Sequence, residues 1–215
     1  YQLFPDSEKE IKILTYKQDR VHDFAWFADK RFIVNTDTCR LSSGKVIDVF
    51  SFYTPDEKET WQHSVAFAKA ATRHYSDWVG EYPYSVVSVV QGPESFGGGM
   101  EYPMITVLSP SDTPRDLDYT IAHEIGHNWF YGILASNERS YPWMDEGINS
   151  YYEYRYQQKK MDHFMLINEQ RMLETQVAEL KDQPINTPSP ECTENKYALI
   201  AYYKTAKWRE LLRKE

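Results

Sequence analysis

Two histidines four positions apart, with a glutamate directly after the first, restrict the fold of this chain more than any other feature. They lie in the segment His123-Glu124-Ile125-Gly126-His127. In an α-helix, residues i and i+4 lie on one face about one turn apart, so both imidazoles can reach one point. Glu124 is offset by one residue and lies beside that point without having to bind there. Because neutral imidazole is a common zinc ligand, the pattern indicates a helix that holds a metal ion.

The alternative is an ordinary helix with two unrelated histidines. Such a motif arises by chance in roughly one chain in a hundred, so a third ligand is needed to support the metal site. A third ligand is available in Glu146, nineteen positions after His127. Gly132 and the polar segment 136–140 supply turn residues for a connection between two antiparallel helices. A catalytic zinc usually takes three protein ligands and leaves one position for water. We therefore expect one zinc ion per chain, bound by His123, His127 and Glu146.

Glu153 is a candidate for supporting that site from outside. It follows Glu146 by seven positions and so falls on the same helical face, two turns further on. A carboxylate there can accept the outer N–H of a metal-bound histidine and fix its tautomer. Asp145 competes for the same role, and the sequence does not decide its direction.

The chain resembles the M1 family of zinc aminopeptidases, which includes aminopeptidase N and leukotriene A4 hydrolase. The histidine motif and the segment Trp143-Met144-Asp145-Glu146-Gly147 carry this resemblance, and two further motifs follow the family's order. Gly98-Gly99-Met100-Glu101-Tyr102 resembles the family's Gly-x-Met-Glu-Asn strand, which recognises the free amino group of the substrate. Tyr202-Tyr203-Lys204-Thr205 resembles its Tyr-x-Lys-Gly segment, whose first tyrosine stabilises an oxyanion.

The resemblance implies a role for each matched residue. Glu124 would be the general base and Tyr202 the oxyanion donor, with Tyr197 matching a second tyrosine five residues earlier. The expected substrate-binding residues are those of the glycine-rich strand: Gly98, Gly99, Met100 and Glu101. Tyr102 in place of Asn and Thr205 in place of Gly are departures from the family pattern, and neither removes a metal ligand or the base.

By the same resemblance, we expect a zinc-dependent aminopeptidase that hydrolyses the N-terminal bond of peptides with a free N-terminus. One alternative is a catalytically silent, peptide-binding relative. Another is a zinc hydrolase of different specificity, either an endopeptidase or an epoxide-hydrolase-like enzyme. The intact ligand and base positions favour the enzyme, and Glu101 favours a substrate with a free amine.

Charge and hydropathy exclude two other classes. The net charge of −8 and the lack of a basic stripe argue against a nucleic-acid-binding protein. No apolar run approaches the roughly 18 residues that a transmembrane helix needs. The two cysteines are too few for a disulfide framework, so the compartment stays open.

Hydrophobic periodicity predicts an α+β fold. We expect strands in 10–16, 24–34, 45–50, 85–90 and 100–108, and helices over 56–79, from 116 through the histidine motif, and near 144–160, 162–180 and 196–214. The resemblance implies that residues 1–52 are the last strands of an N-terminal β domain. Residues 53–215 would be a thermolysin-like catalytic domain, truncated at its C-terminus, that contacts missing N- and C-terminal domains of the same chain.

Overall fold

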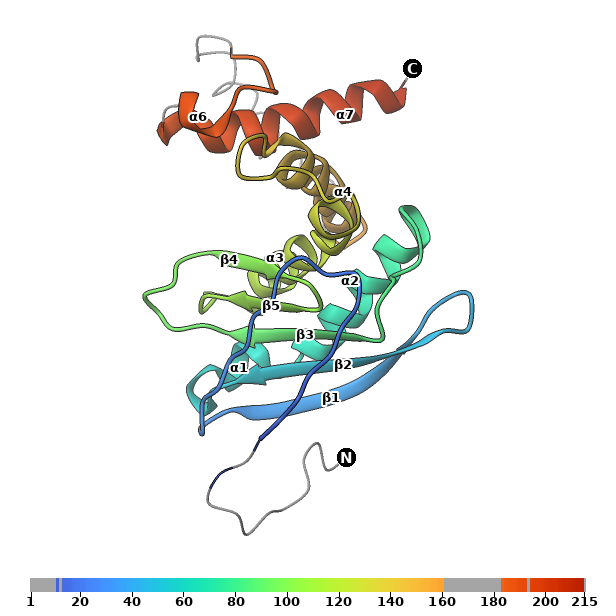
Figure 1. Ribbon diagram of the computed structural model, residues 1–215, viewed down its shortest axis with the longest axis vertical. Coiled ribbons are helices and arrows are strands. Elements are labelled where there is room, and N and C mark those ends of the chain that lie inside the picture. Colours follow the sequence, from blue (N-terminus) through green and yellow to red (C-terminus); the bar gives the residue numbers. More distant parts are fainter. Residues whose placement is uncertain (1–10, 12, 161–182, 193, 215) are drawn as a thin grey trace.

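A five-stranded mixed sheet is the centre of the computed structural model, which describes residues 11, 13–160, 183–192 and 194–214 (Figure 1). The strands, in chain order, are β1 (Ile33–Arg40), β2 (Val46–Tyr53), β3 (Val86–Gln91), β4 (Gly99–Tyr102) and β5 (Ile105–Leu108). Their order across the sheet is β1-β2-β3-β5-β4. Strands β2, β3 and β5 are parallel, while β1 and β4 run antiparallel at the two edges.

Helices cover one face of this sheet and extend away from it (Figure 1). They are α1 (Lys58–Trp61), α2 (Ser64–Trp78), α3 (Pro114–Gly126), α4 (Ile148–Gln158), α6 (Glu194–Ala198) and α7 (Thr205–Lys214). Three π-helical turns, Asn128–Ile133, Trp143–Gly147 and Leu199–Lys204, adjoin them. Short 3-10 turns span Pro55–Glu57 and Ser189–Glu191. No helix among the described residues is long and apolar enough to cross a membrane.

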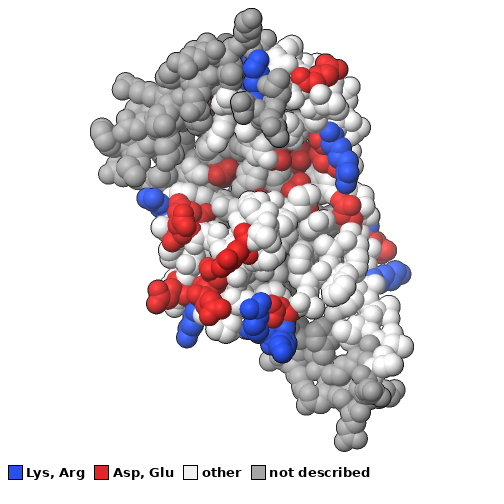
Figure 2. Space-filling model, turned by 90° about the vertical axis from the view of Figure 1, so that its left-hand side faces the viewer, with Lys and Arg blue, Asp and Glu red and all other residues white. Residues whose placement is uncertain are grey.

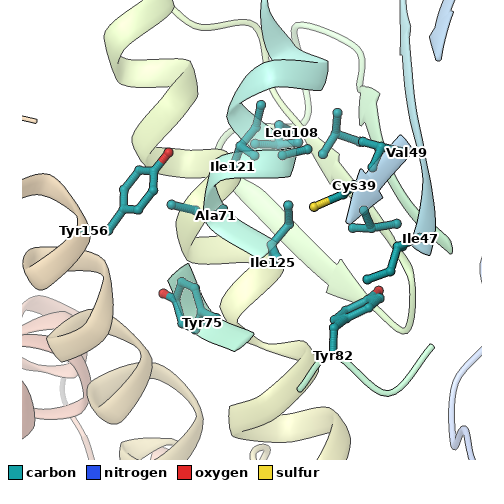
Figure 3. Packing of buried hydrophobic residues seen from close by; sticks show 14 of the residues in the cluster. Cys39, Ile47, Val49, Ala71, Tyr75, Tyr82, Leu108, Ile121, Ile125 and Tyr156 are labelled. Atoms are coloured by element: carbon teal, nitrogen blue, oxygen red, sulfur yellow. The ribbon is translucent and has the colours of Figure 1, made fainter. Parts of the chain in front are cut away.

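The core lies between the sheet and the pair of helices α2 and α3. On α3, buried apolar residues recur at a spacing of four, as a helix with one packed face requires. Small residues on α2 allow the two helices to pack closely. Figure 3 shows these side chains meeting those of the sheet, with Ile121 and Ile125 from α3, Ala71 from α2, and Ile47 and Val49 from β2.

Helix α3 begins where local sequence signals place it. Thr113 accepts a hydrogen bond from the backbone N–H of Asp116 at 3.2 Å and so caps the helix. Pro114 follows at the first helical position, where its missing N–H has no cost. The helix predicted from residue 116 is therefore confirmed, with a start two residues earlier. The segment predicted as a helix over 56–79 is helical too, but it divides into α1 and α2.

The expected strand over 100–108 is wrong, because the structure has a hairpin there. Strands β4 and β5 pair antiparallel around Pro103 and Met104. Met104 has a φ of 67°, a left-handed conformation that a non-glycine residue rarely adopts. No glycine marks the turn, which is why the apolar run read as one continuous strand.

Two of the strands predicted within residues 1–52 are wrong. Described residues of the segment 10–16 form no strand, and of 24–34 only Ile33 and Val34 belong to one. Residues 33–53 form β1 and β2, and β2 pairs directly with β3. Periodicity reveals a strand but not its partner, and it is the family resemblance that predicts a separate β domain for residues 1–52. We propose instead that any domain boundary lies before Ile33.

The C-terminal region contains the other predicted helices. The helix expected near 144–160 corresponds to a π-helical turn followed by α4. Residues expected to be helical over 196–214 form α6, a π-helical turn and α7. The predicted helix at 162–180 lies outside the described residues.

Candidate metal centre

Helices α3 and α4 bring three potential ligand atoms together. The Nε2 atoms of His123 and His127 are 3.1 Å apart at the C-terminal end of α3. Oε2 of Glu146, in the turn before α4, lies 3.3 Å from the first nitrogen and 3.5 Å from the second. All three side chains are mostly buried. Two nitrogens and one carboxylate oxygen therefore converge on a single point, from residues 23 positions apart in the chain.

Two glycines allow the ligand-bearing segments to pack closely, one on the other and on the C-terminal segment. At Gly126, a Cβ atom would overlap Oδ1 of Asn149 on α4 and lie 2.5 Å from the Tyr75 hydroxyl oxygen. At Gly147, a Cβ atom would overlap Thr205 and the carbonyl oxygen of Ala201. Each glycine is needed because a neighbouring element occupies the place of its missing side chain.

Carboxylates bind the outer nitrogens of both histidines. Nδ1 of His123 lies 2.9 Å from Oε2 of Glu153, and Nδ1 of His127 lies 2.5 Å from Oδ1 of Asp145. If each Nδ1 carries the proton of this hydrogen bond, each Nε2 keeps a lone pair directed at the ligand cluster. Glu153 and Asp145 thus do not compete for one histidine, as the sequence had suggested, but each contacts a different one.

Glu124 lies beside the three ligand atoms and is almost fully buried. A Cβ atom at Gly99 on β4 would overlap the Glu124 carboxylate, so that strand leaves room for it only because it has a glycine there. Among the described residues, Oε2 of Glu124 has no hydrogen-bond partner. Burial raises the pKa of Glu124 to about 7. Its carboxylate can therefore exchange a proton near neutral pH.

Glu101 comes to the same cluster from β4. Ligating atoms of Glu101, Glu124 and His127 all lie within 4.8 Å of one another. Burial raises the pKa of Glu101, and the nearby Asp145 and Glu146 carboxylates raise it further, against the opposing effect of His127. The structure thus places this glutamate beside the predicted base and one predicted ligand.

Gly98 and Met100, the other predicted substrate-binding residues, differ in whether they are free to contact a substrate. Gly98 has a φ of 99°, and its N–H donates to Oγ of Ser109 at 3.0 Å. Its carbonyl oxygen accepts the Ser109 N–H at 2.8 Å, so both backbone groups of Gly98 are engaged within the protein. Met100 is 39% exposed at the edge of the sheet. A direct contact with substrate is therefore open to Met100 and less available to Gly98.

Two tyrosines cover the cluster from the C-terminal segment. The ring of Tyr202 stacks on that of His123, with centroids 5.8 Å apart and planes 14° apart. Burial and the hydrogen-bonded carboxylate of Glu146 raise the pKa of Tyr202 far above its ordinary value. The Tyr197 ring packs edge-on against Tyr202 at 6.3 Å, and burial raises the pKa of Tyr197 to about 12. Both hydroxyls are therefore protonated donors at neutral pH.

The electrostatics of the cluster favour a bound cation. Burial disfavours charge on His127, yet the carboxylates of Asp145, Glu101 and Glu146 overcome this and raise the pKa of His127 to about 10. Burial also raises the pKa of Glu146, but the hydrogen bond with His123 and the two histidine charges lower it overall. Figure 2 shows acidic side chains gathered on one face of the molecule, some of them recessed in its surface. Two imidazole nitrogens and one carboxylate in an acidic, buried setting are a donor set that fits zinc.

Sequence reasoning missed three buried residues that hold these elements in place. Nδ2 of Asn149 donates to the carbonyl oxygen of His123 at 2.7 Å, and the Tyr75 hydroxyl donates to Oδ1 of Asn149 at 3.1 Å. Asn128 connects the end of α3 with the β4–β5 hairpin. The only signal for the asparagines is their position, since each is polar on a helix face that must be buried.

Comparison with known proteins gives a family and a fold. The profile described as "Peptidase family M1 domain" matches residues 67–214. A glutamyl aminopeptidase of Rattus norvegicus is 26% identical over 124 residues, which are 52% of this chain and 13% of the relative. Aminopeptidase B of Homo sapiens is 33% identical over 79 residues, which are 35% of this chain and 12% of the relative. The chain thus covers about an eighth of these relatives' length.

Solved structures confirm the predicted α+β fold. An M1 zinc metallopeptidase from Deinococcus radiodurans superimposes with a TM-score of 0.65 at 17% identity, over 85% of this chain and 40% of that one. Aminopeptidase A of Legionella pneumophila, solved in complex with aspartic acid, gives a TM-score of 0.65 at 12% identity, over 84% of this chain and 22% of that one.

Proposed function

Because this chain belongs to the peptidase M1 family, we propose that it carries the catalytic site of a zinc-dependent aminopeptidase. The substrates would be peptides with a free N-terminus, cleaved at their first peptide bond. The observation that supports this most is the convergence of His123, His127 and Glu146 beside a buried carboxylate oxygen of Glu124 that has no partner among the described residues.

His123, His127 and Glu146 would hold one zinc ion per chain. Zinc bound there supplies a Lewis acid that polarises a carbonyl group and lowers the pKa of water. Asp145 and Glu153 orient the two imidazoles through their outer nitrogens, and their negative charge makes both rings stronger ligands.

Glu124 would move the proton. Its Oε2 can accept a proton from the attacking water and later deliver it to the nitrogen of the leaving amine. The raised pKa, about 7, suits a group that must both take up and release a proton near neutral pH. The contact with Gly99 limits the positions that the carboxylate can adopt.

Glu101 would bind the free amine. A charged α-amine and an ionised carboxylate form a charge-assisted hydrogen bond, which determines which peptide bond reaches the metal. Because Glu101 lies within 4.8 Å of Glu124 and His127, it leaves room for only one residue upstream of the scissile bond. This geometry favours an exopeptidase over the endopeptidase alternative.

Tyr202 would donate a hydrogen bond to the carbonyl oxygen as negative charge develops on it. Its stacking on His123 holds the ring next to the predicted ligands, and its hydroxyl is protonated at neutral pH. Tyr197 packs edge-on against it and limits its rotation.

Further parts of the same chain would complete the substrate cleft. The solved M1 relative from Deinococcus radiodurans is about two and a half times as long as the part that this chain covers. Phe24 and Trp26 are 73% and 74% exposed, which is unusual for large apolar side chains. We propose that neighbouring domains cover such positions in the natural protein.

The variant Glu124→Gln in the natural full-length protein tests this function. The amide cannot accept a proton, so turnover of a free peptide should fall by about 10²–10⁴-fold while zinc content stays at one equivalent. Glu81→Gln is a matched control, since Glu81 is exposed and lies outside the site. Equal turnover by Glu124→Gln and wild type would reject this role. A wild type that binds zinc but cleaves no peptide would indicate the silent relative.

A further inference from the structure

We propose that Asn128 is a positioning residue that sets the place of Glu101 relative to the ligand-bearing helix α3. It would thereby determine the preference for a free amine. This inference rests on the proposed function of Glu101 as the amine-binding group, and it concerns a residue that follows the second histidine directly.

Asn128 is buried and uses both ends of its side-chain amide. Nδ2 donates to the carbonyl oxygen of Ile125 at 2.9 Å, which fixes the orientation of the amide on α3. Oδ1 accepts the backbone N–H of Met104 at 3.0 Å. The Tyr82 hydroxyl lies further away, 3.4 Å from the same oxygen, and is 3.0 Å from the Val86 carbonyl oxygen. The contact with Met104 is therefore the main link from Asn128 to the sheet.

Met104 forms the turn of the hairpin that carries Glu101. It has a positive φ, its N–H donates to Asn128, and its carbonyl oxygen accepts the N–H of Ser88 on β3 at 2.8 Å. Among the strands that the structure describes, β4 is at the edge of the sheet and pairs only with β5. Since Glu101 is three residues before this turn, a shift of the turn moves Glu101 with it.

The hairpin contacts α3 at a second point, on the other side of Glu101. Gly99 packs directly on the Glu124 carboxylate, with no room for a Cβ atom. Glu124 and Asn128 are four residues apart and so lie about one helical turn from each other. The close packing at Gly99 limits how near the strand can come, and the directional hydrogen bond to Asn128 limits sliding along the helix. Glu101 lies between the two contacts.

Asn149 performs a comparable task between α4 and α3. It is fully buried, and it links α4 to the backbone of His123 through the bond described above. Loss of Asn149 should therefore disturb Glu146 relative to the histidines, whereas loss of Asn128 should disturb Glu101. The two buried asparagines are therefore a matched pair for experiments. Asn149 links two helices, and Asn128 links α3 to the β4–β5 hairpin.

The experiment compares Asn128→Ala with Asn149→Ala in the natural full-length protein. For Asn128→Ala, zinc content should stay near one equivalent. Its KM for a free-amine peptide should rise about tenfold, because one buried hydrogen bond that places the anchor is lost. Its preference for the free over the N-acetylated peptide should fall by a similar factor. For Asn149→Ala, zinc affinity should fall, with less change in that preference among the zinc-loaded molecules.

A double-mutant cycle separates positioning from general loosening of the structure. Adding Asn128→Ala to Glu101→Ala should cause little further loss of the preference, because the anchor is already absent. Tyr82→Phe should leave the preference unchanged, since it keeps the bond between Asn128 and Met104.

Three outcomes would overturn the proposal. They are an unchanged preference in Asn128→Ala, a loss of zinc in that variant equal to the loss in Asn149→Ala, and additive effects with Glu101→Ala. A wild type with no preference for the free amine would instead reject the exopeptidase function itself. If Asn128→Ala does not fold, hydrogen exchange of the Met104 backbone amide in the wild type tests the link between Asn128 and Met104 instead. Protection as strong as that of α3 amides supports the link, and unprotected exchange rejects it.

Discussion

Replacing Gly126 with alanine should destabilise the protein, although the same change in most helices does the opposite. Gly126 is the last residue of α3. In an unobstructed helix, Gly→Ala stabilises by about 1 kcal/mol. Here the added Cβ atom would overlap Oδ1 of Asn149 and lie 2.5 Å from the Tyr75 hydroxyl oxygen. Both neighbours are buried, so they cannot move into solvent.

The expected size of the effect follows from what the methyl group displaces. Overpacking in a close-packed core costs about 1–3 kcal/mol. Moving Asn149 also breaks its bonds to His123 and Tyr75, each with a net value of about 1 kcal/mol. Against a helix-propensity gain of about 1 kcal/mol, we expect a net destabilisation of about 3 kcal/mol. Because Asn149 is bonded to the backbone of His123, zinc affinity should fall as well.

Urea unfolding of the zinc-free and zinc-loaded forms measures both effects. Gly132→Ala is the matched control, since the nearest atom to a Cβ there is a backbone oxygen at an ordinary 3.4 Å. It should change stability by less than about 1 kcal/mol. The double variant Gly126→Ala with Asn149→Ala should be more stable than the sum of the single effects predicts, because removing the amide makes room. A neutral or stabilising Gly126→Ala would refute this account of how α3 and α4 approach each other.

Two further predictions concern the groups around the ligands. Asp145→Asn should weaken zinc binding by about 10–100-fold, because a carboxylate that orients His127 is lost. Competition with a chelator measures the zinc affinity, and an unchanged affinity would show that Asp145 does not support the site. Tyr202→Phe should lower kcat more than it raises KM if the hydroxyl acts on the developing oxyanion. Steady-state kinetics measure both constants, and a change in KM alone would assign the hydroxyl to substrate binding.

The helical part of the site was predictable because its signals are local. His123 and His127 are four positions apart, so a helix places both on one face, and a turn-forming segment follows before Glu146. Thr113 and Pro114 mark the start of α3 in the same direct way. These features depend on residues a few positions apart, and the structure has the corresponding helices.

The contacts between elements were not predictable, because they depend on which surfaces meet. The sequence names Asp145 and Glu153 as alternatives, and only the packing of α3 on α4 shows that each contacts a different histidine. The hairpin at Met104 lacks a glycine, so it resembles a continuous strand. Strand β1 was missed because its central residues are polar and exposed at a sheet edge.

The central claim is that His123, His127 and Glu146 bind one zinc ion, and anomalous diffraction at the zinc absorption edge tests it most directly. Crystals of the natural protein, purified without chelator, should show one strong anomalous peak per chain. That peak should lie about 2.0–2.2 Å from Nε2 of both histidines and from a carboxylate oxygen of Glu146. No peak at this position in zinc-saturated crystals, or a peak bound by other residues, would contradict the account.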